Sequence, residues 1–191
     1  MGLLYRRKGQ IQLQGVCNAA FAYHLDGRRS HGGYVFLMGG AAISWKSYTI
    51  STVTRSTPES EYVAASDIGA DAIFLRNFLG ELGFRQQGSS SIFTDLTGVH
   101  AIVRDPCNRA RTKQNELHYH YALKHVAAGR LNYKRVKSSE NSSDVLTKPL
   151  PRAAHSYCSF TMGLNEEASK FSDISALPQP VLVTGEVSHS N

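Results

Sequence analysis

The chain has 191 residues, enough for one domain of about 140 to 160 residues with a sizeable core and loose ends. Hydrophobic residues at 41% and charged residues at 19% exclude a chain that is disordered throughout. Lys and Arg outnumber Asp and Glu by 21 to 15, which favours a polyanionic partner, although many basic proteins only carry solvated basic faces.

The cysteines and the N-terminus indicate the compartment. Cys17, Cys107 and Cys158 are widely separated, which excludes a CxxC metal knuckle or a disulfide framework and fits a reducing environment. The N-terminus has no apolar run long enough for a signal peptide or a membrane span. We therefore expect an intracellular protein, cytoplasmic or nuclear, with neither a membrane partner nor a small-molecule substrate.

The first elements are strands. Apolar and polar residues alternate over residues 11–18, which predicts a strand with one buried face. Two apolar runs, residues 34–38 and 41–45, are joined by Gly39-Gly40, a dipeptide that tolerates the positive φ angles of a tight hairpin. The opening therefore predicts a three-stranded meander.

A long amphipathic helix is expected next, with Ser56 or Thr57 as its N-cap and Pro58 in its first turn. Glu61 extends the apolar stripe toward the sheet, where a carboxylate is costly unless it is paired. Alternatively, Glu61 lies beyond the sheet edge in water or acts as a first-turn charge. The stripe, which ends near Gly83, comprises Ala64, Ile68, Ala72, Leu75, Leu79 and Leu82.

The remaining pattern alternates strands and helices. It predicts an α/β fold with a five-stranded mixed sheet and helices on both faces. The expected elements are a strand at 91–95, a short helix at 98–104, a helix at 116–128 closed by Gly129, a strand at 131–136 and a short helix at 141–147. We divide the chain into a lead-in (1–9), the domain (10–150), its C-terminal extension (151–164) and a disordered tail (165–191).

Basic residues are concentrated between residues 104 and 137, where only Asp105 and Glu116 are acidic. Tyrosines are interleaved with them, so the segment has groups that neutralise phosphates and groups that stack or pack on sugars. This pattern favours a nucleic-acid surface over a merely solvated helix face. The expected nucleic-acid-binding residues are Arg104, Arg109, Arg111, Lys113, Lys134 and Arg135.

Three acidic residues, Glu61, Asp95 and Asp144, stand where separate elements are expected to converge. Carboxylates gathered in this way repel one another, so a fold that collects them usually does so to hold a divalent metal. Asn18, at the end of the first strand, has a neutral amide where such a metal site would need a negative charge.

Five ordered motifs between about Gly2 and Leu164 resemble the ribonuclease H domain of copia-type LTR retrotransposon polyproteins. The resemblance implies a ribonuclease H fold, hydrolysis of the RNA strand of an RNA:DNA hybrid by two Mg²⁺ ions held by four carboxylates, and reverse transcriptase as the ancestral partner. It also makes residues 1–9 a remnant of the connection to that enzyme. The motifs are residues 33–37 (GYVFL), 42–45 (AISW), 61–64 (EYVA), 110–113 (ARTK) and 144–150 (DVLTKPL).

Carried over by this resemblance, Glu61, Asp95 and Asp144 match catalytic and metal-binding carboxylates, and Asn18 matches the first aspartate, which bridges both metals. An asparagine there keeps one oxygen, loses the charge and turns an NH₂ group toward a cation, so both metal sites should weaken. Polar groups near the site differ from the family pattern, while motifs expected in the core, such as Trp45 and Leu146, remain.

We therefore expect severely impaired hydrolysis and a nucleic-acid-binding relic. Two alternatives stay open: an active hybrid-specific ribonuclease, supported by the three remaining carboxylates, and a non-catalytic protein-interaction or structural remnant. Binding to phosphates must weaken steeply as salt rises, which separates the relic from the remnant.

Overall fold

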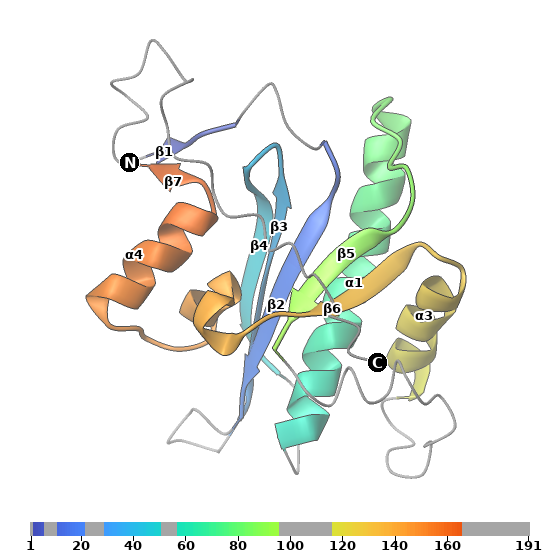
Figure 1. Ribbon diagram of the computed structural model, residues 1–191. Helices are drawn as coiled ribbons and strands as arrows, with labels where there is room; N and C mark the ends of the chain where they lie inside the picture. The colour runs from blue at the N-terminus through green and yellow to red at the C-terminus, as the bar shows by residue number, and fades with distance from the viewer. Residues whose placement is uncertain (1, 6–10, 22–28, 51–56, 96–115, 166–191) are drawn as a thin grey trace, which may run out of the picture.

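The computed structural model describes residues 2–5, 11–21, 29–50, 57–95 and 116–165 (Figure 1). The helix expected at 98–104 and the tail beyond Asn165 lie outside these residues. The main sheet has the order β4-β3-β2-β5-β6, with β2 antiparallel to β3, β3 antiparallel to β4, and β5 parallel to both β2 and β6. The expected five-stranded mixed sheet is therefore confirmed. Its strands are β2 (Gln14–Ala20), β3 (His31–Met38), β4 (Ala41–Thr49), β5 (Ser90–Thr94) and β6 (Leu131–Arg135).

The turn between β3 and β4 follows the sequence prediction. Gly39 and Gly40 have φ angles of 64° and 84°, which L side chains rarely adopt and which match the twist of a tight hairpin. The first strand, however, starts at Gln14 and not at residue 11. The backbone N–H of Leu13 is bonded to the side-chain Oε1 of Gln86 at 2.6 Å, so this stretch is held by a side chain instead of a neighbouring strand.

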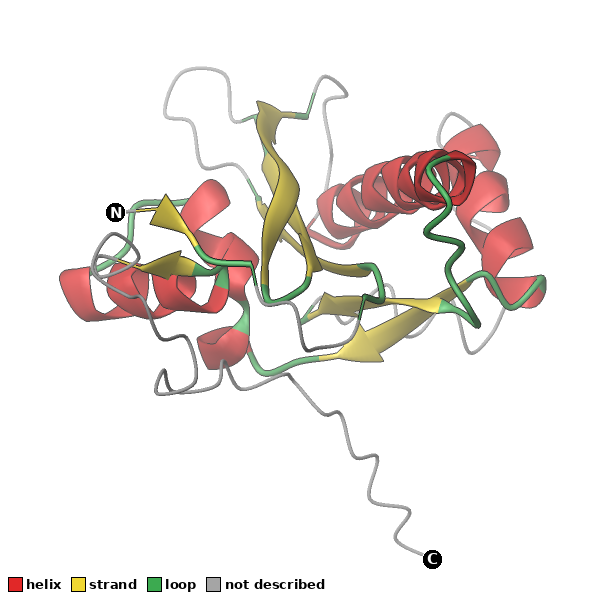
Figure 2. Cartoon of the chain, turned by 90° about the horizontal axis from the view of Figure 1, so that it is seen from above, coloured by secondary structure: helices red, strands yellow, loops and turns green. Residues whose placement is uncertain are grey.

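Successive residues on each central strand belong to two separate cores, one on each face of the sheet. The first core packs against α1 (Thr57–Glu81), with α3 (Glu116–Ala127) beside it, and the second against η2 (Ser142–Leu146) and α4 (Arg152–Thr161), as Figure 2 shows. Helices on both faces are thereby confirmed. Cys17, Tyr34 and Ile92 belong to the first core, and Val16, Val35 and Phe93 to the second.

The long helix α1 buries the expected stripe. Ile68 and Ala72 are fully buried, and the helix ends at Glu81, ahead of Gly83 with its φ of 88°. Leu82 was expected in the stripe but is 56% exposed, because it follows the last helical residue. Trp45 was expected in the core but is 60% exposed, because β4 is an edge strand.

The short helix expected at 141–147 is present as the 3₁₀ helix η2, with Asn141 and Thr147 as its caps. The 3₁₀ helix η1 (Ser138–Glu140) precedes it, and α4, which the sequence pattern did not predict, follows it. The two-residue strands β1 (Gly2–Leu3) and β7 (Leu164–Asn165) pair with each other, and the Ala42 N–H donates to the Met162 carbonyl at 2.9 Å. Both flanking segments thus contact the domain. Among the described helices, none combines the length and apolarity that a membrane crossing needs.

Candidate functional site

The candidate site lies where β2 and β5 end. These strands are parallel, so their carboxyl ends meet at one edge of the sheet, with Cys17 in register with Thr94. This register places Asn18, still in β2, next to Asp95, which directly follows β5. Asp144 lies in η2, which contacts both β2 and β3.

A glycine allows η2 to come this close. Gly33 in β3 is in register with Asn18, and a Cβ added to it would lie 2.7 Å from the Cβ of Leu146. That distance is shorter than two carbon atoms tolerate. The absence of a side chain at Gly33 therefore sets the distance from η2 to the sheet, and with it the position of Asp144.

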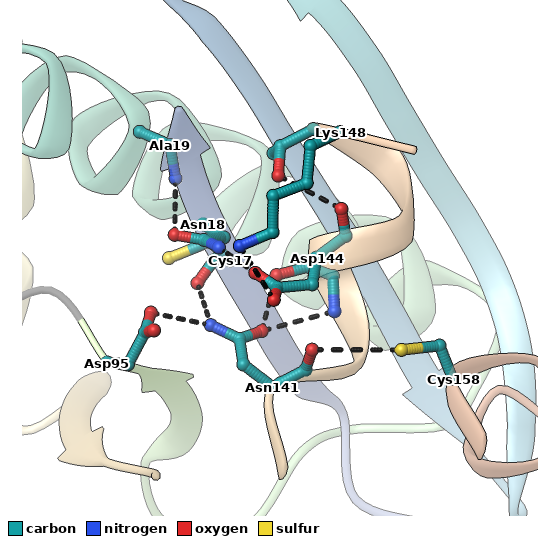
Figure 3. Close-up of polar contacts among 10 residues, drawn as sticks. Cys17, Asn18, Ala19, Asp95, Asn141, Asp144, Lys148 and Cys158 are labelled. Atoms are coloured by element: carbon teal, nitrogen blue, oxygen red, sulfur yellow. Dashed lines mark hydrogen bonds and ion pairs between the residues drawn. The ribbon is translucent and has the colours of Figure 1, made fainter. Parts of the chain in front are cut away.

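Asn18 and Asp144 are directly bonded (Figure 3). The Asn18 Nδ2 donates to Asp144 Oδ1, and the Asn18 Oδ1 accepts the backbone N–H of Ala19 at 2.7 Å. Because an N–H can only donate, the Ala19 contact fixes which end of the amide faces Asp144. Asn18 is only 5% exposed, so water competes little for this bond.

Lys148 occupies the other oxygen of the same carboxylate. Its Nζ lies 2.9 Å from Asp144 Oδ2, four residues away along the chain. The Asp144 side chain is 13% exposed and that of Lys148 is 40% exposed. Both oxygens of Asp144 thus face nitrogen donors of the chain itself.

Asn141 joins three elements to one another. Its Nδ2 donates to the Cys17 carbonyl of β2 at 3.0 Å and to Asp95 Oδ1 at 2.8 Å. Its Oδ1 accepts both the backbone N–H and the hydroxyl of Ser143, at 3.1 and 2.6 Å, which caps the start of η2. Asn141 is 1% exposed, so the bonds that connect β2, the end of β5 and η2 are shielded from bulk water.

A curated relative resembles most of the chain. The Retrovirus-related Pol polyprotein from transposon TNT 1-94 of Nicotiana tabacum is 34% identical over 153 residues, which are 80% of this chain and 11% of that polyprotein. The chain therefore spans about a tenth of the relative's length. No family model matches the chain.

Solved structures show the same fold. The N-terminal ribonuclease H domain of a Mycobacterium tuberculosis protein, solved as a fusion with maltose binding protein, has a TM-score of 0.52 at 14% identity, covering 80% of this chain and 99% of that one. LC11-RNase H1 in complex with an RNA/DNA hybrid has a TM-score of 0.50 at 13% identity, covering 71% and 94%. The chain belongs to the ribonuclease H-like domains of retrotransposon Pol polyproteins.

The structure places the remaining expected residues of this ribonuclease H-like domain as follows. Glu61 is partly buried in the second turn of α1. Lys134 and Arg135 end β6 beside the site, since Arg135 is in register with Thr94, the residue before Asp95. Four expected binding residues lie outside the described part of the chain: Arg104, Arg109, Arg111 and Lys113.

Two residues at the site were missed as functional candidates. Asn141 could have been found as an N-cap, because an Asn directly before a Ser-Ser-Asp turn commonly bonds its backbone. Lys148 could have been found from its i,i+4 spacing to Asp144, which brings opposite charges together on one turn.

Cys17 adjoins Asn18 but is no nucleophile in this ribonuclease H-like domain. It is fully buried in the α1-facing core, and that burial raises the pKa of its thiol to about 12. The reactive species of cysteine is the thiolate, which such a pKa suppresses at neutral pH.

The family resemblance implies Mg²⁺, and the donors as arranged do not fit a pair of such ions. Within the described residues, no group of three or more His, Cys, Asp or Glu side chains is placed to hold a metal ion. Asn18 and Lys148 direct N–H groups at Asp144, and Asn141 directs one at Asp95. Mg²⁺ needs several oxygens turned toward it. A metal set of Glu61, Asp95 and Asp144 therefore stays a prediction.

Proposed function

We propose that this ribonuclease H-like domain binds RNA:DNA hybrid or a related nucleic acid and has largely lost the RNA hydrolysis of its family. The observation that carries the proposal is the hydrogen bond from the Asn18 amide to Asp144. It stands at the position where the resemblance implies an aspartate that bridges two metal ions.

The charge at that position argues against efficient hydrolysis. In two-metal hydrolysis the two ions would stabilise the attacking and leaving oxygens, and an anionic oxygen between the ions would hold both of them. Asn18 has no charge, and its one oxygen already accepts the Ala19 N–H. An amide that donates to Asp144 also withdraws that carboxylate from metal binding, so one substitution weakens two ligands.

Nucleic-acid binding is supported by charge near the site. Lys134 and Arg135 end β6 at the edge where Asn18, Asp95 and Asp144 meet. The Lys134 ammonium lies 5.9 Å from the centre of the Phe93 ring, a residue of the second core, so Lys134 is on the η2 side of the sheet. A phosphate backbone that crosses this edge would meet both basic groups. Reverse transcriptase, the ancestral partner, would supply the rest of such a surface.

An active hybrid-specific ribonuclease is the second candidate. It is favoured by the retention of Glu61, Asp95 and Asp144 as acids. The third candidate is a protein-interaction or structural remnant with no nucleic-acid partner. It is favoured only by the missing negative charge at Asn18.

Cleavage of a labelled RNA:DNA hybrid, in Mg²⁺ and in Mn²⁺, tests the proposal. We expect no cleavage by the natural chain, cleavage by Asn18→Asp, and binding of uncleaved hybrid by both. Equal cleavage by the two chains would establish the active ribonuclease. Binding that is absent, or unchanged as salt rises, would leave the remnant, since phosphate contacts must respond to salt.

A further inference from the structure

A hollow of about 350 Å³ opens beside the polar site. Residues 145–150, from the end of η2 to the turn before α4, line it together with His31 of β3 and His155 of α4. His31 is in register with Ala20, the last residue of β2, so the hollow lies at the same end of the sheet as Asn18. We name it the His31–His155 pocket.

The pocket combines apolar walls with basic groups. Its lining includes no Asp or Glu among the residues described. An anion would therefore meet no repulsion from the lining itself. The apolar part is Val145, Leu146, Pro149 and Leu150, and the basic part is His31, Lys148 and His155.

Hydrogen bonds hold one wall in place. The Ser47 hydroxyl donates to the Leu146 carbonyl at 2.7 Å. The hydroxyl oxygen of Ser47 also lies 3.0 Å from His31 Nε2. Because the Ser47 proton points to Leu146, its oxygen is the acceptor, and His31 Nε2 carries the donated proton. These two bonds hold the His31 ring beside the Leu146 part of the pocket lining.

The other two basic groups can reach a ligand. The Lys148 ammonium has three N–H donors, and the ion pair with Asp144 at 2.9 Å uses one of them. His155 is exposed on α4, and its Nδ1 lies 3.5 Å from Ser159 Oγ, which turns Nε2 to the opposite side of the ring. A phosphate between Lys148 and His155 would receive charge-assisted bonds.

We infer that the His31–His155 pocket receives one nucleotide of a nucleic-acid strand. The phosphate pairs with Lys148 and His155, while the base or sugar packs on His31 and the apolar wall. The size agrees, because pockets for small ligands start near roughly 300 Å³ and are mostly apolar with a few polar groups. Aromatic and imidazole rings also accept unpaired bases by stacking.

This inference rests on the proposed function and names a place for one part of the strand. Lys148 pairs with Asp144 and also lines the pocket, so the pocket adjoins the polar site. A nucleic-acid strand that crosses the site would therefore place a neighbouring nucleotide at the pocket. An acidic peptide would pair with the same basic groups but has no base to stack on an imidazole ring.

The test compares two negative charges on one helix in the full chain. His155→Glu puts a carboxylate in the pocket, whereas Ser156→Glu adds the same charge one residue on, at an exposed position outside the lining. Fluorescence anisotropy with a labelled RNA:DNA hybrid should show about tenfold weaker binding for His155→Glu. Ser156→Glu should bind nearly as the natural chain does. Equal binding by all three chains, or equal weakening by both variants, would contradict nucleotide binding in the pocket and would leave the proposed function intact.

A direct probe separates failure of the pocket from failure of the function. Adenosine 5′-monophosphate should shift the imidazole NMR signals of His31 and His155 in a saturable way, and N-acetylglutamate should not. Saturable shifts in a chain that binds no hybrid would support the pocket while removing the proposed function. Absence of shifts, or equal shifts with N-acetylglutamate, would overturn the nucleotide assignment.

Discussion

The amide of Asn18 donates a hydrogen bond to the carboxylate of Asp144, 126 residues further along the chain. Lys148 pairs with the second oxygen of that carboxylate, and Asn141 bonds Asp95. Each carboxylate of the cluster therefore has a nitrogen partner from the chain itself. Through these contacts the cluster connects β2, the end of β5 and η2.

Replacing Asn18 by Asp should make the stability of the domain depend on metal. In EDTA the new carboxylate faces Asp144 and loses the donor, so the free energy of unfolding should fall by about 1 to 3 kcal/mol. Mg²⁺ should restore part of that loss, because a cation can then bind between the two acids. Thermal unfolding of both chains, with EDTA and with Mg²⁺, measures the difference.

Asn18→Ala is the matched control for this change. It removes the donor without adding a charge, so it should lose stability and show no response to Mg²⁺. A natural chain whose melting temperature rises with Mg²⁺ as much as that of Asn18→Asp would contradict the expected weakening of metal binding by Asn18.

Asn141→Ala should be among the more harmful single changes in the domain. It leaves the Cys17 carbonyl and the Ser143 N–H buried without their partner and frees Asp95. Leaving such groups unpaired should cost about 2 to 4 kcal/mol, measured by urea unfolding. Asn132→Ala, at an exposed position of β6, should change stability by less than about 0.5 kcal/mol. Similar losses for the two variants would show that the Asn141 bonds contribute little.

Gly33→Ala should disturb the site through η2. The new Cβ would lie 2.7 Å from Leu146 Cβ and 3.1 Å from its backbone carbon, so η2 must shift. We expect a loss of about 1 to 3 kcal/mol. Gly80→Ala in α1 meets nothing within 4 Å and should gain up to about 1 kcal/mol from helix propensity. Equal stabilities in chemical denaturation would show that η2 adapts without cost.

Stability should fall as the pH rises above about 9. Burial raises the pKa of the Cys17 thiol from its ordinary 9.0 to about 12, and burial also raises the pKa of Tyr48 and of Tyr133. In this range the unfolded chain releases protons that the folded chain keeps, so the unfolded state binds fewer protons and each pH unit lowers stability. Each such group contributes at most about 1.4 kcal/mol per unit.

Urea unfolding at stepped alkaline pH measures this slope, and Cys17→Ala isolates the part that belongs to Cys17. The variant should lose stability with a slope smaller by one proton between about pH 9 and about pH 12. An unchanged slope would mean that the thiol of Cys17 ionises in the folded state as readily as in the unfolded state.

Lys134→Gln with Arg135→Gln should weaken hybrid binding and flatten its dependence on salt. For each phosphate that the variant no longer neutralises, the slope of log K against log salt should become shallower by about one unit. Arg85→Gln is the control, because Arg85 precedes Gln86, which bonds Leu13 at the other end of the sheet. Anisotropy titrations over a salt series decide the matter, and equal slopes for the control and the double variant would remove the β6 residues from the binding surface.

The local elements could be predicted because their causes are local. Alternation along a strand and a stripe along a helix record which side is buried, and both are visible within a few residues. The hairpin at Gly39-Gly40 and the end of α1 before Gly83 follow from φ angles that favour glycine. The α4 helix was missed because it begins after Pro151 without a capping side chain, and within it only Cys158 and Ser159 are buried.

The bonding inside the site was a matter of tertiary structure. From the sequence, Asn18 was an amide in place of a charge, and Asp95 and Asp144 were expected to lie near it, both from the convergence of separate elements and from the family resemblance. That Asn18 donates to Asp144, and that Asn141 spans to both Cys17 and Asp95, depends on the order of the strands and on the approach of η2 over Gly33. Hydrogen bonds act over about 3 Å, so residues more than a hundred positions apart become partners only once the sheet has formed around them.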